Sequence, residues 1–525
     1  MTFDILIKKG KIIDGTGNTW YKSDIAVEDG KIAAIGSNLG GADKVIDAKG
    51  HIVAPGFIDI HSHSDIPLLI DPRGMSKITQ GVTTEVIGNC GLSAAPMNQW
   101  LQEYRNRYAR AQLSEGFSYN WTDMSSYLEK LMERGVALNV APLAGHGTIR
   151  QCVMGDVDQL PTFSMLNEMK KLLRDSLDQG AWGLSTGLIY TPNQYSSTEE
   201  IIELARELPA YDALYATHIR GEGNTVIQAI DEANRIGREA GVRVQISHFK
   251  VCGSNNWGKS KDTLQMVIDA RANGVDVDFD QYPYTASSTG LSAILPPWVH
   301  DGGIEKLIAR LKDPETRALI RGQPTEEMED WSRIQVVHTR NHPEYIGLSV
   351  DQIASRMGVD PFDAMCDLLI AEDSQVLVVL FEMEEMDVRR IMGSPLGMVG
   401  SDGRAVASDS VFNEGKCHPR YYGTFPRVLG YYVREGVINL QEAVRKMTSA
   451  PARRLGIRDR GLLIEGMKAD ITLFNPEKVK DNATFTDPHR YSSGIPYVLV
   501  NGEPVISKSK YTGALPGMVL RKTLS

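Results

Sequence analysis

Gly56-Phe57-Ile58-Asp59-Ile60-His61-Ser62-His63 joins an apolar β-type run to a His-x-His pair, and this stretch decides the fold of the 525-residue chain. Side chains two residues apart in a strand share a face, so His61 and His63 lie together at the end of the run. Two neutral imidazoles suit a divalent metal ion, which needs further N, S or O ligands from elsewhere in the fold. A His-x-His pair on its own is more often an ordinary surface or core pair.

Four further ligand-type residues each come at the end of another apolar run: Cys90, His218, His248 and Asp402. Barrel enzymes place their functional groups in this way, at the carboxyl ends of parallel strands. The joint pattern therefore predicts a metal site built from several strands, although no single run would justify that prediction.

Composition favours an enzyme of the cell interior. The apolar fraction is 42%, charged residues make up 23%, and the formal net charge is -10, which argues against a nucleic-acid partner. The five cysteines are odd in number and show no framework spacing, as expected in a reducing compartment. The sequence shows no secretion signal and no apolar stretch of the ~20 residues that span a membrane. We expect a cytoplasmic protein without a membrane partner, and an oligomer is possible.

The chain divides into a β-rich pair of ends and an α/β middle. Residues 1–55 and 456–525 alternate short β-type runs with turns, which predicts one small β-sandwich or β-barrel domain built from both termini. Residues 56–455 alternate apolar runs with helical patterns, which predicts a (β/α)8 TIM-like barrel. Its eight strands are expected near 57–61, 83–88, 138–143, 181–185, 214–218, 243–248, 275–280 and 397–402. An open doubly wound sheet is the alternative, but no Gly-x-Gly-x-x-Gly fingerprint follows a strand.

The segment between the seventh and eighth strands is too long for one crossover. We expect an insertion at about residues 285–345 that acts as a lid over the catalytic end of the barrel. A packing subdomain without substrate contact is the alternative.

Several motifs together carry a family resemblance. The chain resembles the metal-dependent amidohydrolase superfamily in three features: the His-x-His stretch, the β-rich segment before it, and Gly466-Met467-Lys468-Ala469-Asp470-Ile471 after the barrel. More narrowly, the chain resembles the N-acyl-D-amino-acid deacylases, or D-aminoacylases, over nearly its whole length. The motifs that carry the narrower resemblance are Gln80-Gly81-Val82-Thr83-Thr84, Gly88-Asn89-Cys90-Gly91, Gly145-His146-Gly147-Thr148, Ser401-Asp402-Gly403, His418-Pro419-Arg420 and Gly423-Thr424-Phe425-Pro426-Arg427.

The resemblance implies a zinc enzyme that hydrolyses N-acyl-D-amino acids. Cys90, His218 and His248 would hold one tight zinc ion, while His61 and His63 would form a second site that is weaker or vacant. Many superfamily members bridge two metals with a carboxylated lysine on the fourth strand, but the run 181–186 has no lysine. A thiolate from the second strand can supply the missing negative charge.

Asp402 is the expected general base, which takes a proton from water and returns it to the departing amine. The alternative role for Asp402 is that of an N-cap in the Ser-Asp-Gly turn.

An anionic substrate is expected at the same end of the barrel. Lys250, Tyr282 and Arg420 follow the sixth, seventh and eighth strands and suit a carboxylate, and the resemblance adds Ser288 to this group. The apolar stretch Leu291 to Trp298 favours hydrophobic D-side chains. The long polar loop from Gly403 to Cys417 leaves room for dipeptides with a D-residue. An enzyme that opens cyclic amides and a non-catalytic scaffold protein also stay open at this point.

Overall fold

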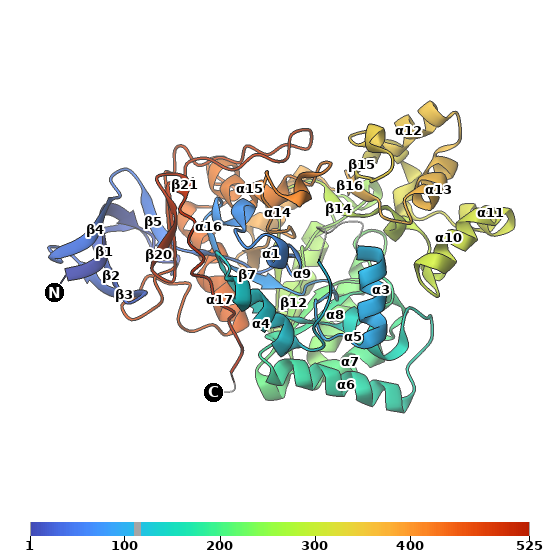
Figure 1. The fold of residues 1–525 in the computed structure, drawn as a ribbon, viewed down its shortest axis with the longest axis horizontal. Helices are drawn as coiled ribbons and strands as arrows, with labels where there is room; N and C mark the ends of the chain where they lie inside the picture. Colours follow the sequence, from blue (N-terminus) through green and yellow to red (C-terminus); the bar gives the residue numbers. More distant parts are fainter. Residues whose placement is uncertain (1, 110–116, 524–525) are drawn as a thin grey trace.

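The computed structural model describes residues 2–109 and 117–523, and a barrel of parallel strands lies at its centre (Figure 1). Its strands are β6 (Phe57–Asp59), β7 (Val82–Ile87), β8 (Asn139–Pro142), β10 (Gly183–Gly187), β11 (Leu214–His218), β12 (Arg243–Ile246), β13 (Val277–Gln281) and β17 (Gly397–Val399). Each of the eight overlaps a run that the sequence predicts.

The strands form two parallel arcs that meet in a closed barrel. One arc runs β6-β7-β8, and the other runs β9-β10-β11-β12-β13-β17, where β9 is Ala144–Gly145 directly after β8. A parallel bridge between Ser62 and Gly403 joins the first and last strands, and Trp182 N donates to Pro142 O (2.8 Å) at the other junction. Closure confirms the (β/α)8 barrel and excludes the open sheet.

Helices surround the barrel and cover it with their apolar faces. They include α2 (Met75–Ile78), α4 (Met124–Arg134), α6 (Phe163–Asp178), α7 (Thr198–Ala205), α8 (Val226–Ala240), α9 (Ser260–Ala272), α14 (Glu385–Gly393), α16 (Leu440–Met447) and α17 (Ser449–Leu455). In α8 the buried residues Val226, Ala229, Ile230 and Ala233 recur at helical spacing and share the main core with the strands. None of the described helices is both long enough and apolar enough to cross a membrane.

A second domain contains strands from both ends of the chain. Its sheet comprises β1 (Thr2–Ile12), β2 (Tyr21–Glu28), β3 (Lys31–Gly36), β4 (Gly41–Asp47), β5 (Ile52–Pro55), β18 (Ile471–Phe474), β19 (Tyr497–Val500), β20 (Glu503–Ser507) and β21 (Lys510–Tyr511). Antiparallel pairing of β5 with β18 joins the two terminal parts, and residues from both share one hydrophobic core. The outermost positions 1, 524 and 525 of the expected domain lie outside the described residues.

The last residues of the chain leave this sheet and lie along the barrel. Pro516 and Val519 form bridges with Val136 and Val140, and the Trp182 indole donates to Leu520 O (2.6 Å). The C-terminal segment therefore contributes to the barrel as well as to the terminal sheet.

An insertion between β13 and β17 extends from the barrel on the side away from the terminal sheet (Figure 1). Its three antiparallel strands are β14 (Ser287–Gly290), β15 (Ile334–His338) and β16 (Leu377–Leu380), and its helices are α10 (Ile304–Lys312), α11 (Pro314–Arg321), α12 (Val350–Met357) and α13 (Pro361–Ala371). Because β16 pairs with β14, the inserted segment continues well beyond residue 345. It has a hydrophobic core of its own, which includes Leu291, Ile294 and Leu295.

Candidate metal centre and active site

The predicted ligand residues lie at the carboxyl ends of the barrel strands. His61 and His63 follow β6, Cys90 follows β7 and His248 follows β12, while His218 is the last residue of β11. Asp402 follows β17 in the same way. Parallel strands bring their carboxyl ends to one rim, so residues far apart in the sequence meet there.

Three of these residues have left-handed backbone conformations. The φ angle is 52° at Cys90, 35° at His248 and 49° at Asp402. Such conformations cost a non-glycine residue ~1–3 kcal/mol each and concentrate at functional sites. At this rim they turn the chain sharply after its strand and fix the direction of each side chain.

Four donor atoms from four strands form a tight buried group. Cys90 Sγ lies 3.4 Å from His61 Nε2 and 3.5 Å from His248 Nε2. Asp402 Oδ1 lies 3.5 Å from His61 Nε2, and the ligand atoms of all four residues lie within 4.8 Å of one another. Sulfur, imidazole nitrogen and carboxylate oxygen at such spacing form a donor set suited to a transition-metal cation.

A second group shares His248 and adds Glu222, which the sequence reasoning missed. Glu222 Oε1 lies 3.1 Å from His248 Nδ1, and Glu222 Oε2 lies 3.5 Å from His218 Nε2. Neither ring nitrogen of the buried His218 makes a hydrogen bond with the described residues, as expected of an imidazole that coordinates a metal ion. The available signal was weak, because an acid four residues after a histidine is common.

The electrostatics of the cluster favour a thiolate. Burial raises the pKa of Cys90, but the imidazoles of His61, His218 and His248 outweigh it and hold this pKa well below its usual range. A thiolate is the form in which cysteine binds metal ions. Cys90 is therefore prepared to act as a ligand at neutral pH.

Asp280, at the end of β13, holds two of the imidazole residues in place. Its Oδ1 accepts a hydrogen bond from His248 N (2.8 Å) and lies 3.2 Å from His61 Nδ1. A carboxylate behind a ligand histidine fixes the ring orientation and its tautomer. The sequence reasoning did not single out Asp280, although it ends a predicted strand.

Two of the residues expected to bind a carboxylate, Arg420 and Lys250, lie beside the ring of a third, Tyr282. Arg420, the first residue of α15 (Arg420–Arg427), forms an ion pair with Asp402, in which Nη2 lies 3.0 Å from Oδ2, and its guanidinium lies 4.8 Å from the centroid of the Tyr282 ring. Lys250 pairs with Glu222, and its Nζ lies 5.7 Å from the same ring centroid. His63 Nε2 lies 3.0 Å from Asp402 Oδ1.

Among the described residues, the Tyr282 hydroxyl and Arg420 Nε and Nη1 make no hydrogen bond. Ser288 differs, because its hydroxyl donates to Val378 O (2.8 Å) within the insertion. The first three atoms are therefore the donors still open to a ligand.

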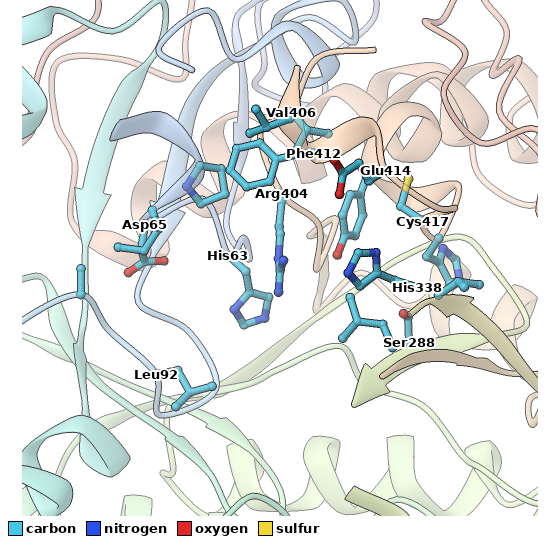
Figure 2. Close-up of a pocket in the computed structure, with 18 of the residues that line it drawn as sticks. His63, Asp65, Leu92, Ser288, His338, Arg404, Val406, Phe412, Glu414 and Cys417 are labelled. Carbon is cyan, nitrogen blue, oxygen red and sulfur yellow. The ribbon is translucent and has the colours of Figure 1, made fainter. Parts of the chain in front are cut away.

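Two adjoining cavities open beside the cluster. The inner cavity, about 330 Å³, is lined by Cys90, Asp402 and Arg420 together with apolar residues such as Ile189 and Leu377. The outer cavity, about 440 Å³, lies between the loop after β17 and the insertion, and Figure 2 shows His63, Arg404 and Ser288 around it. Residues of the insertion therefore form part of the walls of both cavities.

The apolar stretch 291–298 contributes little to these cavities. Leu291, Ile294 and Leu295 are buried in the core of the insertion, and the inner cavity is lined instead by Ser292 and Ala293 from this segment. The expectation that its large apolar side chains form a substrate pocket is therefore wrong. These residues are apolar because they hold the insertion together.

A family model described as amidohydrolase family matches residues 44–506. The chain belongs to the amidohydrolase family. This amidohydrolase is 38% identical to a D-aminoacylase from Alcaligenes xylosoxydans xylosoxydans over 99% of its own length and 98% of that protein. It is also 38% identical to an N-acyl-D-glutamate deacylase of the same organism, over 99% and 97% of the two chains.

Solved structures agree with the family assignment. An N-acyl-D-glutamate deacylase from Bordetella bronchiseptica, complexed with zinc and a phosphonate mimic of the tetrahedral intermediate, matches with a TM-score of 0.85 and 36% identity over 99% of this chain and 100% of that one. A D-aminoacylase with a binuclear metal centre, described as activated by one metal and attenuated by a second, matches with a TM-score of 0.84 and 37% identity at the same coverage. The resemblance to the N-acyl-D-amino-acid deacylases is confirmed.

Proposed function

We propose that this amidohydrolase uses zinc to hydrolyse the amide bond of N-acyl-D-amino acids, releasing a carboxylate and a free D-amino acid. The observation that carries the proposal is the meeting of Cys90 with His61, His248 and Asp402 at one rim, next to the guanidinium of Arg420. A metal cluster and a carboxylate-binding cation side by side suit an amide whose amine half retains a carboxylate.

Cys90, His218 and His248 are the proposed ligands of one tight zinc ion, and His61 and His63 belong to a second, weaker or vacant site. The thiolate of Cys90 and the ring nitrogens of His218, which make no hydrogen bond with the described residues, support the first set. The Cys90 sulfur also lies close to His61 Nε2, so it can contribute to both sites. Zinc held by these residues would supply Lewis-acid chemistry, which makes water a better nucleophile at neutral pH.

Asp402 is the proposed general base. It accepts a proton from the attacking water and returns it to the amine nitrogen as the amide bond breaks. Its contacts with His63 and Arg420 hold the carboxylate at the edge of the cluster, where both transfers take place. An N-cap role alone would not require these two partners.

Lys250, Tyr282, Ser288 and Arg420 are proposed to hold the substrate carboxylate. Once the carboxylate and the acyl group are both fixed, only one enantiomer can direct its side chain into the remaining space. The free donors of Tyr282 and Arg420 support this assignment. Lys250 acts together with Glu222, with which it is already paired.

Metal analysis and a substrate panel test the proposal. The purified protein should contain about one zinc per chain, as a site with a thiolate and two imidazoles holds the ion tightly. N-Acetyl-D-amino acids should be hydrolysed far faster than their L-enantiomers, and N-acetyl-D-amino amides without a free carboxylate should be poor substrates. Equal rates for both enantiomers, or preferential opening of cyclic amides, would contradict it.

A further inference from the structure

Arg404 has no role in the site described so far, although it lines both cavities. It lies two residues after Asp402, and Figure 2 shows its side chain extending into the pocket beside His63. The outer cavity is also lined by Arg105 and Lys416, but neither of these cations reaches the inner cavity. Arg404 is thus a positive charge at the passage between the two cavities.

Arg404 is half-buried, and its guanidinium makes no hydrogen bond or ion pair with the described residues. No carboxylate oxygen of the described chain lies within ion-pair distance of it. Three acids line the cavities: Asp402 pairs with Arg420, Asp65 accepts from Gly88 N, and Glu414 is an exposed side chain that forms no ion pair with Arg404. By contrast, Arg105 donates to Ser93 O and Thr148 Oγ1. A partly desolvated cation without a partner gains most from an incoming anion.

The backbone around Arg404 is held firmly. Arg404 O accepts a hydrogen bond from Ser76 Oγ (3.1 Å), Gly403 O accepts one from His63 N (2.8 Å), and Ala405 N donates to Ser64 Oγ (2.8 Å). The polar loop therefore begins on the rigid end of β6, not in solvent. When Arg404 binds a ligand, the side chain is therefore ordered but the backbone does not have to be.

We propose that Arg404 forms a second anion-binding subsite, which selects substrates with a carboxylate in addition to the one next to the scissile amide. This inference rests on the proposed N-acyl-D-amino-acid hydrolysis and names the substrate class within it. The second carboxylate can belong to the D-side chain or to the acyl group, since either can extend from the amide toward the outer cavity. Arg404 is a binding residue and takes no part in proton transfer.

Paired substrates test the subsite. N-Acetyl-D-glutamate is compared with N-acetyl-D-glutamine for a side-chain carboxylate, and N-succinyl-D-leucine with N-butanoyl-D-leucine for an acyl carboxylate. For at least one pair, we expect Arg404→Gln to lower the ratio of kcat/KM between the charged and the neutral compound by ~10², through the lost charge-assisted hydrogen bonds. The pair that responds identifies the source of the carboxylate. The ratio is independent of the amount of folded enzyme.

Two further variants sharpen the result. Arg404→Lys keeps the charge without the forked geometry, so it should retain part of the ratio. Arg458→Gln removes an exposed arginine that lines neither cavity, and it should leave the ratio unchanged. If Arg404→Gln leaves both ratios unchanged, the subsite is refuted. An equal loss of kcat/KM on the charged and the neutral compounds would in addition place Arg404 with the first carboxylate.

A binding measurement separates this inference from the proposed reaction. If the wild-type enzyme hydrolyses none of the four compounds, the same pairs are titrated calorimetrically with wild-type protein and Arg404→Gln. Preferential binding of a charged compound that depends on Arg404 would retain the subsite and refute the reaction. Absence of such a preference would refute the subsite as well.

Discussion

Asp402 has close partners on both of its oxygens. Oδ1 lies 3.0 Å from His63 Nε2, and Oδ2 forms an ion pair with Arg420, whose Nη2 lies 3.0 Å away. Burial raises its pKa, but Arg420, His248 and His63 outweigh burial and hold this pKa well below its usual range. The carboxylate is therefore ionised at neutral pH, which is the form that can accept a proton.

Replacing Asp402 by asparagine should remove the base and keep the shape of the site. We expect Asp402→Asn to lower kcat by at least ~10³ with little change in KM, while metal analysis finds the tight zinc retained. The matched control is Asp409→Asn, an exposed acid of the same loop that pairs with Arg73, and it should turn over normally. Near-normal turnover by Asp402→Asn would exclude it from the reaction.

Cys90 is the residue on which metal binding should depend most. Cys90→Ser removes the thiolate and should lose most of the bound zinc, while far-ultraviolet circular dichroism shows an intact fold. Cys152→Ser should keep its zinc, because Cys152 lies on helix α5 (His146–Met154) outside the cluster. Full zinc content in Cys90→Ser would rule out the proposed ligand set.

At the scale of elements, one buried ion cluster ties a short helix to three barrel strands. Lys77 of α2 lies 2.7 Å from Asp59 Oδ2 and 2.7 Å from Glu85 Oε1, and it donates to Ser401 Oγ (2.6 Å). Asp59 ends β6, Glu85 belongs to β7, and Ser401 follows β17. The cluster therefore lies where the barrel closes, next to the metal ligands.

Removing the ammonium should leave two carboxylates buried without their cation. We expect Lys77→Met to lower the free energy of unfolding by ~3–5 kcal/mol, as measured by urea denaturation. Lys130→Met breaks an exposed pair with Glu133 on α4 and should change it by less than ~1 kcal/mol. Equal effects of the two substitutions would show that the buried cluster does not stabilise closure.

At the scale of the whole molecule, Glu382 links the insertion to the barrel. It follows β16, and its backbone oxygen accepts hydrogen bonds from Gly253 N (2.9 Å) and Trp257 Nε1 (3.0 Å) of the loop after β12. Its carboxylate accepts from Ser287 Oγ. Burial raises the pKa of Glu382 to about 7.

This shift predicts how stability depends on pH. Between the unfolded pKa of about 4.5 and the folded value of about 7, the folded state binds a proton that the unfolded state has lost. The contribution of Glu382 to stability is therefore present below pH ~4.5, is lost as pH rises through 7, and amounts to at most ~3 kcal/mol. Thermal unfolding measures this effect: as the pH rises from 5 to 8, the Tm of Glu382→Gln should increase relative to the Tm of the wild type. If the Tm of the variant and that of the wild type changed with pH in parallel, Glu382 would not be the group responsible.

The sequence by itself determined the barrel and the residues that meet at its rim. The apolar runs were sufficient for this prediction, because a strand buried in a parallel sheet is apolar along its own length. These runs end in His61, Cys90, His218, His248 and Asp402. Parallel strands then bring their carboxyl ends to a single edge whatever the connections are. A β domain built from both termini was predicted in the same way, since both ends show strand patterns without helices; the pairing of β5 with β18 itself was seen only in the structure.

Tertiary structure alone decided what each segment packs against. The stretch 291–298 is equally apolar whether it lines a pocket or fills the core of the insertion, and only the fold shows that it fills the core. The insertion extends beyond the predicted end at residue 345 because β14 pairs with β16, some ninety residues further along the chain. No local sequence pattern encodes this contact. Glu222, Asp280 and Arg404 became recognisable only through their neighbours, because the role of a charged side chain depends on the partners that the fold brings to it.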